Sequence, residues 1–521
     1  MPRLGLGSSL TGGAATGANL NFESTWATTG SDETVTLPFV NDGNTINFTI
    51  DWGDGSSDSV TAYNNDLGEG AIDHVYSTAA TYTIKMAGTI SGLKFNNGGH
   101  KTKLKTITNW GSLNISTNNA FYGCSALTVS AEDAPTISTT DFSYLFRGCS
   151  VFNTDISSWD VSSVTTFYGL LHSCTVFNQP LNAWDTSSLT NCYAVFYNCR
   201  AFDQPLSNWD MSSVTYIGYM FVYATDFNQN IGAWDVGEVT NMFQTFDHAT
   251  VFNNGGSDSI KDWDVSKVTT MYNTFSHCDA FNQPLTNWDT GEVTTMFGMF
   301  VDCPAFNNTI GGWDTAKVTS MASMFQECDI FNQDITNWNT AAVTDMNKMF
   351  QVARRFNQAI NTDGVKWNTA AVTNMSGMFN TYSADFNQDI GDWNTGEVTN
   401  MYWMFNACDS FNQDLSDWDV SKVANMKEMF KSADDFDQDL SEWDFDDVTS
   451  ASTGFNEFMN GKTGGNVMST ANYNALLVQI EDTNEETDLV FDGGGAEPTG
   501  AGDTARAALI TRGWTITDAD T

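Results

Sequence analysis

Five histidines are the residues with the broadest chemistry in this sequence, because an imidazole can act as a base or bind a metal ion. They are His74, His100, His172, His248 and His277. Their neighbours match no nucleophile elbow, no helical pair of zinc-binding histidines and no phosphate-binding loop. His172 and His277 lie near a column of small residues in the repeats described below, where packing explains them. We therefore expect no catalytic histidine.

Carboxylates are the second source of chemistry. The 521 residues include 63 Asp and Glu against 21 Lys and Arg, a formal net charge of −42. Two carboxylates can hydrolyse a glycosidic bond, but acidic residues recur at equivalent places here and no pair stands out. We expect a protein that is not an enzyme. So strong a negative charge also disfavours nucleic acid and anionic membrane surfaces as partners.

The composition favours a folded chain that does not enter a membrane. Hydrophobic residues make up 41% and aromatic residues 13% of the sequence, far more than a disordered acidic chain carries. No stretch approaches the roughly 18 apolar residues of a membrane span. The opening residues, MPRLGLGSSLTGGAATG, lack the apolar segment of a secretory signal.

Tryptophans mark an internal repeat whose usual length is 25 residues. One unit, Phe177 to Ala201, reads FNQPLNAWDTSSLTNCYAVFYNCRA. Two units are four residues longer between their Phe and Trp, which predicts surface loops around Gly255 to Lys261 and Thr362 to Lys366. Twelve of the 17 tryptophans share one register and predict a structural ladder: Trp159, Trp184, Trp209, Trp234, Trp263, Trp288, Trp313, Trp338, Trp367, Trp393, Trp418 and Trp443.

Each unit combines two apolar periods. The stretch FNQPL predicts a short strand. After Trp184, apolar residues from Leu189 to Cys199 are spaced 3, 3, 1 and 3 apart, which predicts one or two helical turns. A unit of this size cannot bury its own apolar face, so it must stack on its neighbours. The sequence predicts an α/β repeat solenoid, leucine-rich-repeat-like, of about 12 to 13 coils.

The acidic residue after each tryptophan has two interpretations. An Asp or Asn followed by Ser or Thr is typical of a helix cap or an Asx-turn, and Asn339, Asn368 and Asn394 fit this reading. A column of carboxylates would instead bind Ca²⁺, the one cofactor that remains possible. The acidic members are Asp160, Asp185, Asp210, Asp235, Asp264, Asp289 and Asp314.

Nine cysteines predict buried free thiols. Eight of them share one register, which Ala224, Ala249, Ala353 and Ala433 fill in other units. The position therefore demands a small buried side chain, and stacked thiols point in parallel directions that disfavour disulfides. Cysteine usage does not indicate the redox compartment.

Two sets of charged residues are candidate partner-binding sites. In the later units, the residue before the Leu or Ile is an outward Asp, whereas earlier units carry Pro at this position. We call this column of Asp residues the acidic stripe. A basic cluster near residue 100 could dock on an acidic surface of another copy. The two sets are Asp334, Asp389, Asp414 and Asp439, and Lys94, Lys101, Lys103 and Lys105. A solvated face and a solvated junction are the alternatives.

The chain is organised in five parts. These are a Gly-rich arm (1–20), a small β-sandwich (21–93), a junction and N-terminal cap (94–133), the repeat array (134–450) and a C-terminal α/β cap (451–521). In the last part, the segments ANYNALLVQI and TARAALITR predict helices, whereas DLVFDGG and WTIT predict strands. Such a cap shields the last apolar unit.

The segment 21–93 resembles PKD-type domains, an immunoglobulin-like all-β fold, through the WGDG at Trp52 to Gly55 and the later His74, Tyr76 and TYTI. Asp51 and Asp54 of this motif are weak candidates for binding a cation. A role in the turn is the alternative.

The array resembles the BspA-type leucine-rich-repeat surface proteins. The resemblance rests on WDVSxVTxM, then MF, then Cys or Ala, then FNQ, repeated across the units. It implies a solenoid used for adhesion and surface display in bacterial and phage-encoded proteins. Without a secretory signal, we expect a phage virion component such as a tail fibre, appendage or capsid decoration. Its partners would be other virion proteins, copies of itself, or a host-surface protein or glycan. A bacterial cell-surface or extracellular adhesin is the alternative.

Overall fold

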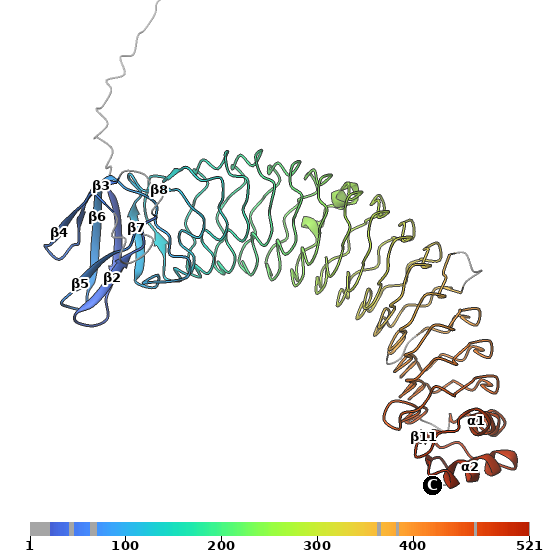
Figure 1. Ribbon diagram of the computed structural model, residues 1–521. Helices are drawn as coiled ribbons and strands as arrows, with labels where there is room; N and C mark the ends of the chain where they lie inside the picture. The colour runs from blue at the N-terminus through green and yellow to red at the C-terminus, as the bar shows by residue number, and fades with distance from the viewer. Residues whose placement is uncertain are drawn as a thin grey trace, which may run out of the picture. The chain divides into compact units, whose positions relative to one another are not determined.

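The computed structural model describes residues 21–40, 46–62, 70–361, 366–381, 385–462 and 466–519 (Figure 1). The chain divides into two compact units. Unit 1 consists of residues 1–139 and 145–160, and unit 2 of residues 140–144 and 161–521. The expected Gly-rich arm and Thr362 to Val365 of the second expected loop lie outside the described residues.

The first four strands in the order of the main sheet of unit 1 pair antiparallel. Its strands β1 (Phe22–Ala27), β3 (Asn47–Asp51), β4 (Ser57–Val60) and β6 (Thr81–Thr89) pair in the order β4-β3-β6-β1. Alternate residues of β1 and β3 are buried, as expected of strands with one face on a core.

A second, smaller sheet completes this part. β2 (Glu33–Leu37) and β5 (Ile72–Tyr76) pair antiparallel with each other. Trp26, Trp52 and Tyr76 are fully buried in the core of unit 1. The expectation of short antiparallel strands in two sheets is met by these elements.

The main sheet continues into the segment expected to form the junction. β7 (Leu104–Asn109) pairs antiparallel with β1, and β9 (Thr128–Val129) pairs parallel with β7. β8 (Asn114–Ile115) pairs parallel with β10 (Thr136–Ile137). The edge of β1 is thereby covered rather than left open to another chain. Pairing changes from antiparallel to parallel where the repeats begin.

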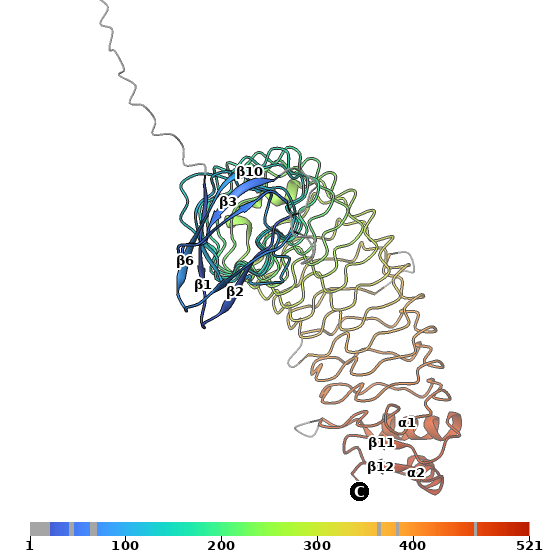
Figure 2. The ribbon, with the colours of Figure 1, turned by 60° about the vertical axis from the view of Figure 1, so that its left-hand side comes forward.

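Successive repeats of unit 2 stack in parallel (Figure 2). Single-residue bridges join equivalent positions, for example Asn241 to Thr270 and Thr270 to Thr295. A threonine ladder runs beside them: the backbone N–H and the Oγ1 of Thr294 both donate to the carbonyl oxygen of Thr269, each at 2.9 Å. Because both donors of each threonine are used between repeats, neighbouring repeats are fixed in register.

Consecutive turns, not helical turns, follow each tryptophan. The backbone N–H groups of Ala194, Phe196 and Asn198 donate to carbonyl oxygens of the next repeat, so they are unavailable for the i to i−4 bonds of an α-helix. Ala194 and Asn198 also have φ of 53° and 55°, which an α-helix excludes. The helical turns expected in each repeat are therefore absent from its described residues. The described residues between Ile137 and Val490 form no strand, so the short strand predicted at FNQPL is also absent, and single-residue bridges take its place. The apolar spacing of the repeats reflects turns that direct every third or fourth side chain inward.

Aromatic columns run through the core of unit 2. The rings of Trp313 and Trp338 are parallel, with centroids 6.3 Å apart, and the phenyl rings of Phe300 and Phe325 are 5.8 Å apart. Trp367 departs from the column, since its ring is inclined by 81° to that of its successor. All twelve tryptophans of the expected ladder are at most 5% exposed.

The first long loop is only partly a surface feature. It forms two short 3-10 helices, η2 (Asn254–Gly256) and η3 (Asp258–Asp262). Ile260 is fully buried and takes the place that leucine holds in other repeats. The four extra residues are accommodated without interrupting the core.

A cap of two helices and two strands follows the repeats. α1 (Thr470–Thr483), β11 (Val490–Asp492), α2 (Ala501–Thr511) and β12 (Thr515–Thr517) confirm the four elements predicted there, and β11 pairs parallel with β12. The Nε2 of Gln479 donates to the carbonyl oxygen of Trp443 at 2.7 Å, which places α1 against the last repeat.

Candidate recognition surfaces

The acidic stripe is exposed, and each of its members closes a local turn. In Asp334, Asp389, Asp414 and Asp439, Oδ1 accepts the backbone N–H two residues later at 2.9–3.0 Å. The hydrogen bonds from Thr336 hold the pKa of Asp334 below its ordinary value, so this carboxylate is ionised at neutral pH. The turn thus involves one carboxylate oxygen and leaves the side chain at the surface.

Two of the four stripe residues line the same hollow. Asp389 and Asp414 line a space of about 190 Å³ together with Asp392 and Asp417, and neither Asp334 nor Asp439 contributes to it. A neighbouring hollow of about 380 Å³ is also acidic, with Asp444 among its lining residues. The stripe is therefore one part of a broader acidic surface on the later repeats.

From Asp185 onward, the Asp or Asn after each tryptophan of the ladder forms an Asx-turn. Asp210 shows the pattern: its Oδ1 accepts from the backbone N–H of Ser212 at 3.0 Å and from the Oγ at 2.6 Å. Asn394 does the same with the backbone of Gly396, although it is uncharged. The turn interpretation is confirmed. Whether Ca²⁺ also binds this column stays a prediction.

The basic cluster serves the fold of unit 1. The Nζ of Lys103 is 2.8 Å from the Oε1 of Glu33, and this side chain is only 14% exposed. The hydrogen bond from Lys103, together with backbone N–H donors, lowers the pKa of Glu33 to about 2. Lys101 and Lys105 donate to nearby carbonyl oxygens. For Lys94 the backbone N–H donates to Pro38. The cluster's role in docking stays a prediction.

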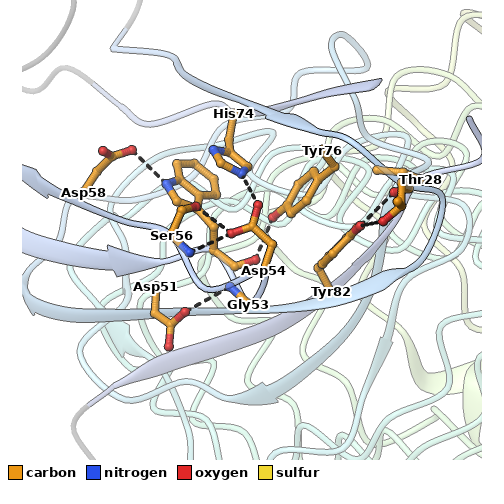
Figure 3. Close-up of polar contacts among 11 residues, drawn as sticks. Thr28, Asp51, Gly53, Asp54, Ser56, Asp58, His74, Tyr76 and Tyr82 are labelled. Atoms are coloured by element: carbon orange, nitrogen blue, oxygen red, sulfur yellow. Dashed lines mark hydrogen bonds and ion pairs between the residues drawn. The ribbon is translucent and has the colours of Figure 1, made fainter. Parts of the chain in front are cut away.

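Asp51 and Asp54 hold the WGDG turn (Figure 3). The Oδ1 of Asp51 accepts from Gly53, and that of Asp54 accepts from the N–H and Oγ of Ser56. The Oδ2 of Asp54 lies 2.8 Å from the Nε2 of His74. Hydrogen bonds from Ser56 and His74 lower the pKa of Asp54 to about 2. Both carboxylates thus have local partners that account for their positions.

An asparagine ladder runs through the repeats, and the sequence reasoning missed it. The Oδ1 of Asn307 accepts from the backbone N–H of Asn332 and from the Nε2 of Gln333, both at 2.9 Å. Asp203 accepts the equivalent pair in an earlier repeat. The recurring FNQ is the signal: its Asn is an acceptor for the next repeat, and its Gln is a donor to the previous one.

An aromatic row lies beside the bridges in the earlier repeats and was also missed. Ring centroids are 4.4 Å apart between Tyr168 and Tyr193, and 4.7 Å apart between Tyr272 and Phe297. The signal was an aromatic residue directly after the inward Phe, Cys or Met of most of these units, with Tyr216 and Tyr219 flanking that position in one unit. The aromatic row consists of half-buried residues: Tyr168, Tyr193, Tyr216, Tyr219, Phe243, Tyr272 and Phe297.

Comparison with protein families identifies the repeats. A family described as "Mycoplasma protein of unknown function, DUF285" matches residues 93–206, 182–283, 254–363 and 359–464. These four overlapping matches span well over half of the chain. The chain belongs to the DUF285 family.

Membership in the DUF285 family accounts for the repeat architecture and leaves the function open. The family description assigns no activity and no partner. Neither the curated proteins nor the solved structures contain a match to this chain. Within the described residues, neither helix has the length and apolar character needed to cross a lipid bilayer.

Proposed function

We propose that this protein is a non-enzymatic attachment protein, displayed on a phage virion as a fibre, appendage or capsid decoration. Its repeats form one continuous solenoid that carries the recognition surface. The observation that carries the proposal is the aromatic row, because partly exposed stacked rings contribute less to a core than fully buried ones do.

The positions that hold the solenoid together differ from those that vary at its surface. Phe, Trp, Thr and Asn recur in nearly every repeat, since their contacts join one repeat to the next. The position of the aromatic row changes instead: it holds Tyr272 and Phe297, then Ala322, Asn347 and Ser376. Such freedom at an outward position supports recognition that is independent of folding.

Tyrosine suits recognition for physical reasons. Its ring offers a large contact area at the cost of ordering two torsions, and its hydroxyl can hydrogen-bond to a polar partner. A row over six repeats provides several adjacent contacts of modest strength. Display of many copies of the protein would increase the overall binding strength. A host-surface glycan or protein is the ligand that this surface fits. The acidic surface of the later repeats would select partners with positive charge.

A bacterial cell-surface adhesin is the second candidate. The observation in its favour is the family match, since the family description names a cellular organism, Mycoplasma. The contact surface would be the same in both cases, and only the displaying surface differs. Mass spectrometry of purified virions and of surface-labelled cells distinguishes the two candidates. If the protein is detected on neither surface, the proposal that it is displayed is overturned.

Binding of the purified protein to candidate host cells tests the contact surface. We expect Tyr168→Ala, Tyr193→Ala and Tyr272→Ala, combined, to lower binding by about tenfold or more. Tyr402→Ala is the matched control, because Tyr402 holds the same repeat position outside the row. A second variant reverses the charge of Asp389, Asp414 and Asp439. Unchanged binding by both variants, with circular dichroism showing intact folding, would contradict recognition through these surfaces.

A further inference from the structure

A buried carboxylate and two histidines meet on the surface of unit 2. Asp247 is only 5% exposed. Its Oδ1 lies 2.8 Å from the Nδ1 of His248 and 3.4 Å from the Nδ1 of His277. The three ligand atoms all lie within 4.8 Å of one another, and both imidazoles are half-buried.

The stacking of the repeats holds these side chains in place. The backbone N–H of His248 donates to Ser276 at 2.8 Å, and that of His277 donates to Val301. Both histidines have φ near 60°, at 60° and 56°, and occupy the same position in successive repeats. Their rings consequently stack with centroids 3.9 Å apart and planes 15° apart.

Surrounding polar groups contact Asp247 and His277. The Nε2 of Gln244 donates to the Oδ2 of Asp247 at 2.7 Å, which turns Oδ1 toward the histidines. The Oγ of Ser276 lies 2.7 Å from the Nδ1 of His277. The bond from Gln244 is an outer partner typical of metal ligands, because it leaves Oδ1 of Asp247 available to an ion. The contact from Ser276 is made to the ligand atom itself, so the serine hydroxyl must turn away when an ion binds.

The local charge favours a cation. A carboxylate as buried as that of Asp247 is costly unless positive charge is close, and among the described residues its ion-pair partners are the two histidines. A divalent ion bound to Asp247 would supply balancing positive charge.

We propose that Asp247, His248 and His277 bind one divalent transition-metal ion of the zinc class, through one carboxylate oxygen and two imidazole nitrogens. Zn²⁺ accepts this donor set, whereas Ca²⁺ prefers oxygen ligands throughout. Ligands about 2.0–2.1 Å from a tetrahedral ion lie about 3.3 Å from each other, close to the 2.8 Å and 3.4 Å found. Because the two imidazole rings are nearly parallel, one of them must rotate about its Cβ–Cγ bond before both nitrogens point at the same ion. This torsion has a broad energy minimum.

Titration calorimetry of the chelator-treated full-length protein with Zn²⁺ tests the site. We expect one saturable equivalent, and about 100-fold weaker binding in His277→Gln and in His248→Gln. The matched control is His172→Gln, which removes a histidine that stacks on Tyr197, far along the chain from the cluster. Affinity unchanged in both cluster variants, or equal loss in the control, overturns the proposal.

Cobalt binding to the unaltered protein gives a second readout that does not depend on any variant folding. The visible spectrum of Co²⁺ should show the strong absorption of a tetrahedral site and should disappear when Zn²⁺ is added. A weak octahedral spectrum, or no saturable binding, overturns the proposal. Metal binding is measured independently of attachment to a host. The metal-site proposal and the attachment proposal can therefore fail separately.

Discussion

The indole Nε1 of Trp288 donates a 2.8 Å hydrogen bond to the carbonyl oxygen of Ile260, in the preceding repeat. The same bond joins Trp313 to Leu285 and Trp443 to Leu415. The tryptophan column therefore contributes directional bonds between repeats as well as apolar area. Trp263 is an exception, because its buried Nε1 has no partner among the described residues.

This difference predicts unequal costs for one substitution. Trp288→Phe removes a cross-repeat bond, whereas Trp263→Phe removes an unsatisfied donor and a similar ring area. We expect Trp288→Phe to lower the free energy of unfolding by about 1 kcal/mol more than Trp263→Phe does. Urea unfolding followed by circular dichroism measures both values. Equal losses would show that the indole bond does not stabilise the repeats.

The asparagine ladder predicts that an acceptor is required in each repeat. Asn307→Ala leaves the N–H of Asn332 and the amide of Gln333 without their acceptor, at a cost of about 1–3 kcal/mol in unfolding free energy. Asn307→Asp keeps the acceptor, as Asp203 does naturally, and should cost less. Melting temperatures of the two variants check this order, and the reverse order would contradict it.

The cysteines should resist alkylation in the native protein. All nine are free and buried, and burial raises the pKa of the Cys303 thiol well above its usual value. The Sγ of Cys303 also donates to the carbonyl oxygen of Phe275. We expect no iodoacetamide labelling at pH 8 by mass spectrometry, and nine labelled sites after denaturation. Rapid native labelling at the Cys303 position would show that the column opens.

Lys462 predicts a dependence of stability on pH. Burial lowers the pKa of its amine from 10.5 to about 8. Between these values the unfolded chain binds more protons than the folded chain, so this group makes stability rise with pH across that window. Below pH 8 the charged amine is buried and destabilising.

Replacing Lys462 by methionine removes that penalty. We expect Lys462→Met to melt at a higher temperature than the unaltered protein at pH 7, with the difference shrinking from about pH 8 to 10.5. Lys422→Met is the control, since the Lys422 side chain is half exposed and pairs with Glu397. A difference that stays constant across the window would contradict burial of the Lys462 charge.

Much of the repeat followed from local patterns. The tryptophan register and the small position shared by Cys303 and Ala249 recur often enough to define a unit. The Asx-turns at Asp210 and Asn394 are formed within three residues, so side-chain chemistry alone indicated them. The prediction of helical turns was wrong. The apolar spacing shows which side chains face inward, but it does not show which carbonyl oxygen accepts from each backbone N–H.

The sequence by itself determined the length of the repeat, its buried positions and its local turns, because these depend on residues close together in the chain. Only the tertiary structure decided which distant groups meet. His248 and His277 are 29 residues apart, and they stack only because the intervening insertion adds four residues without shifting the register. Likewise, Lys103 bonds to Glu33 because β7 adds to the sheet edge at β1.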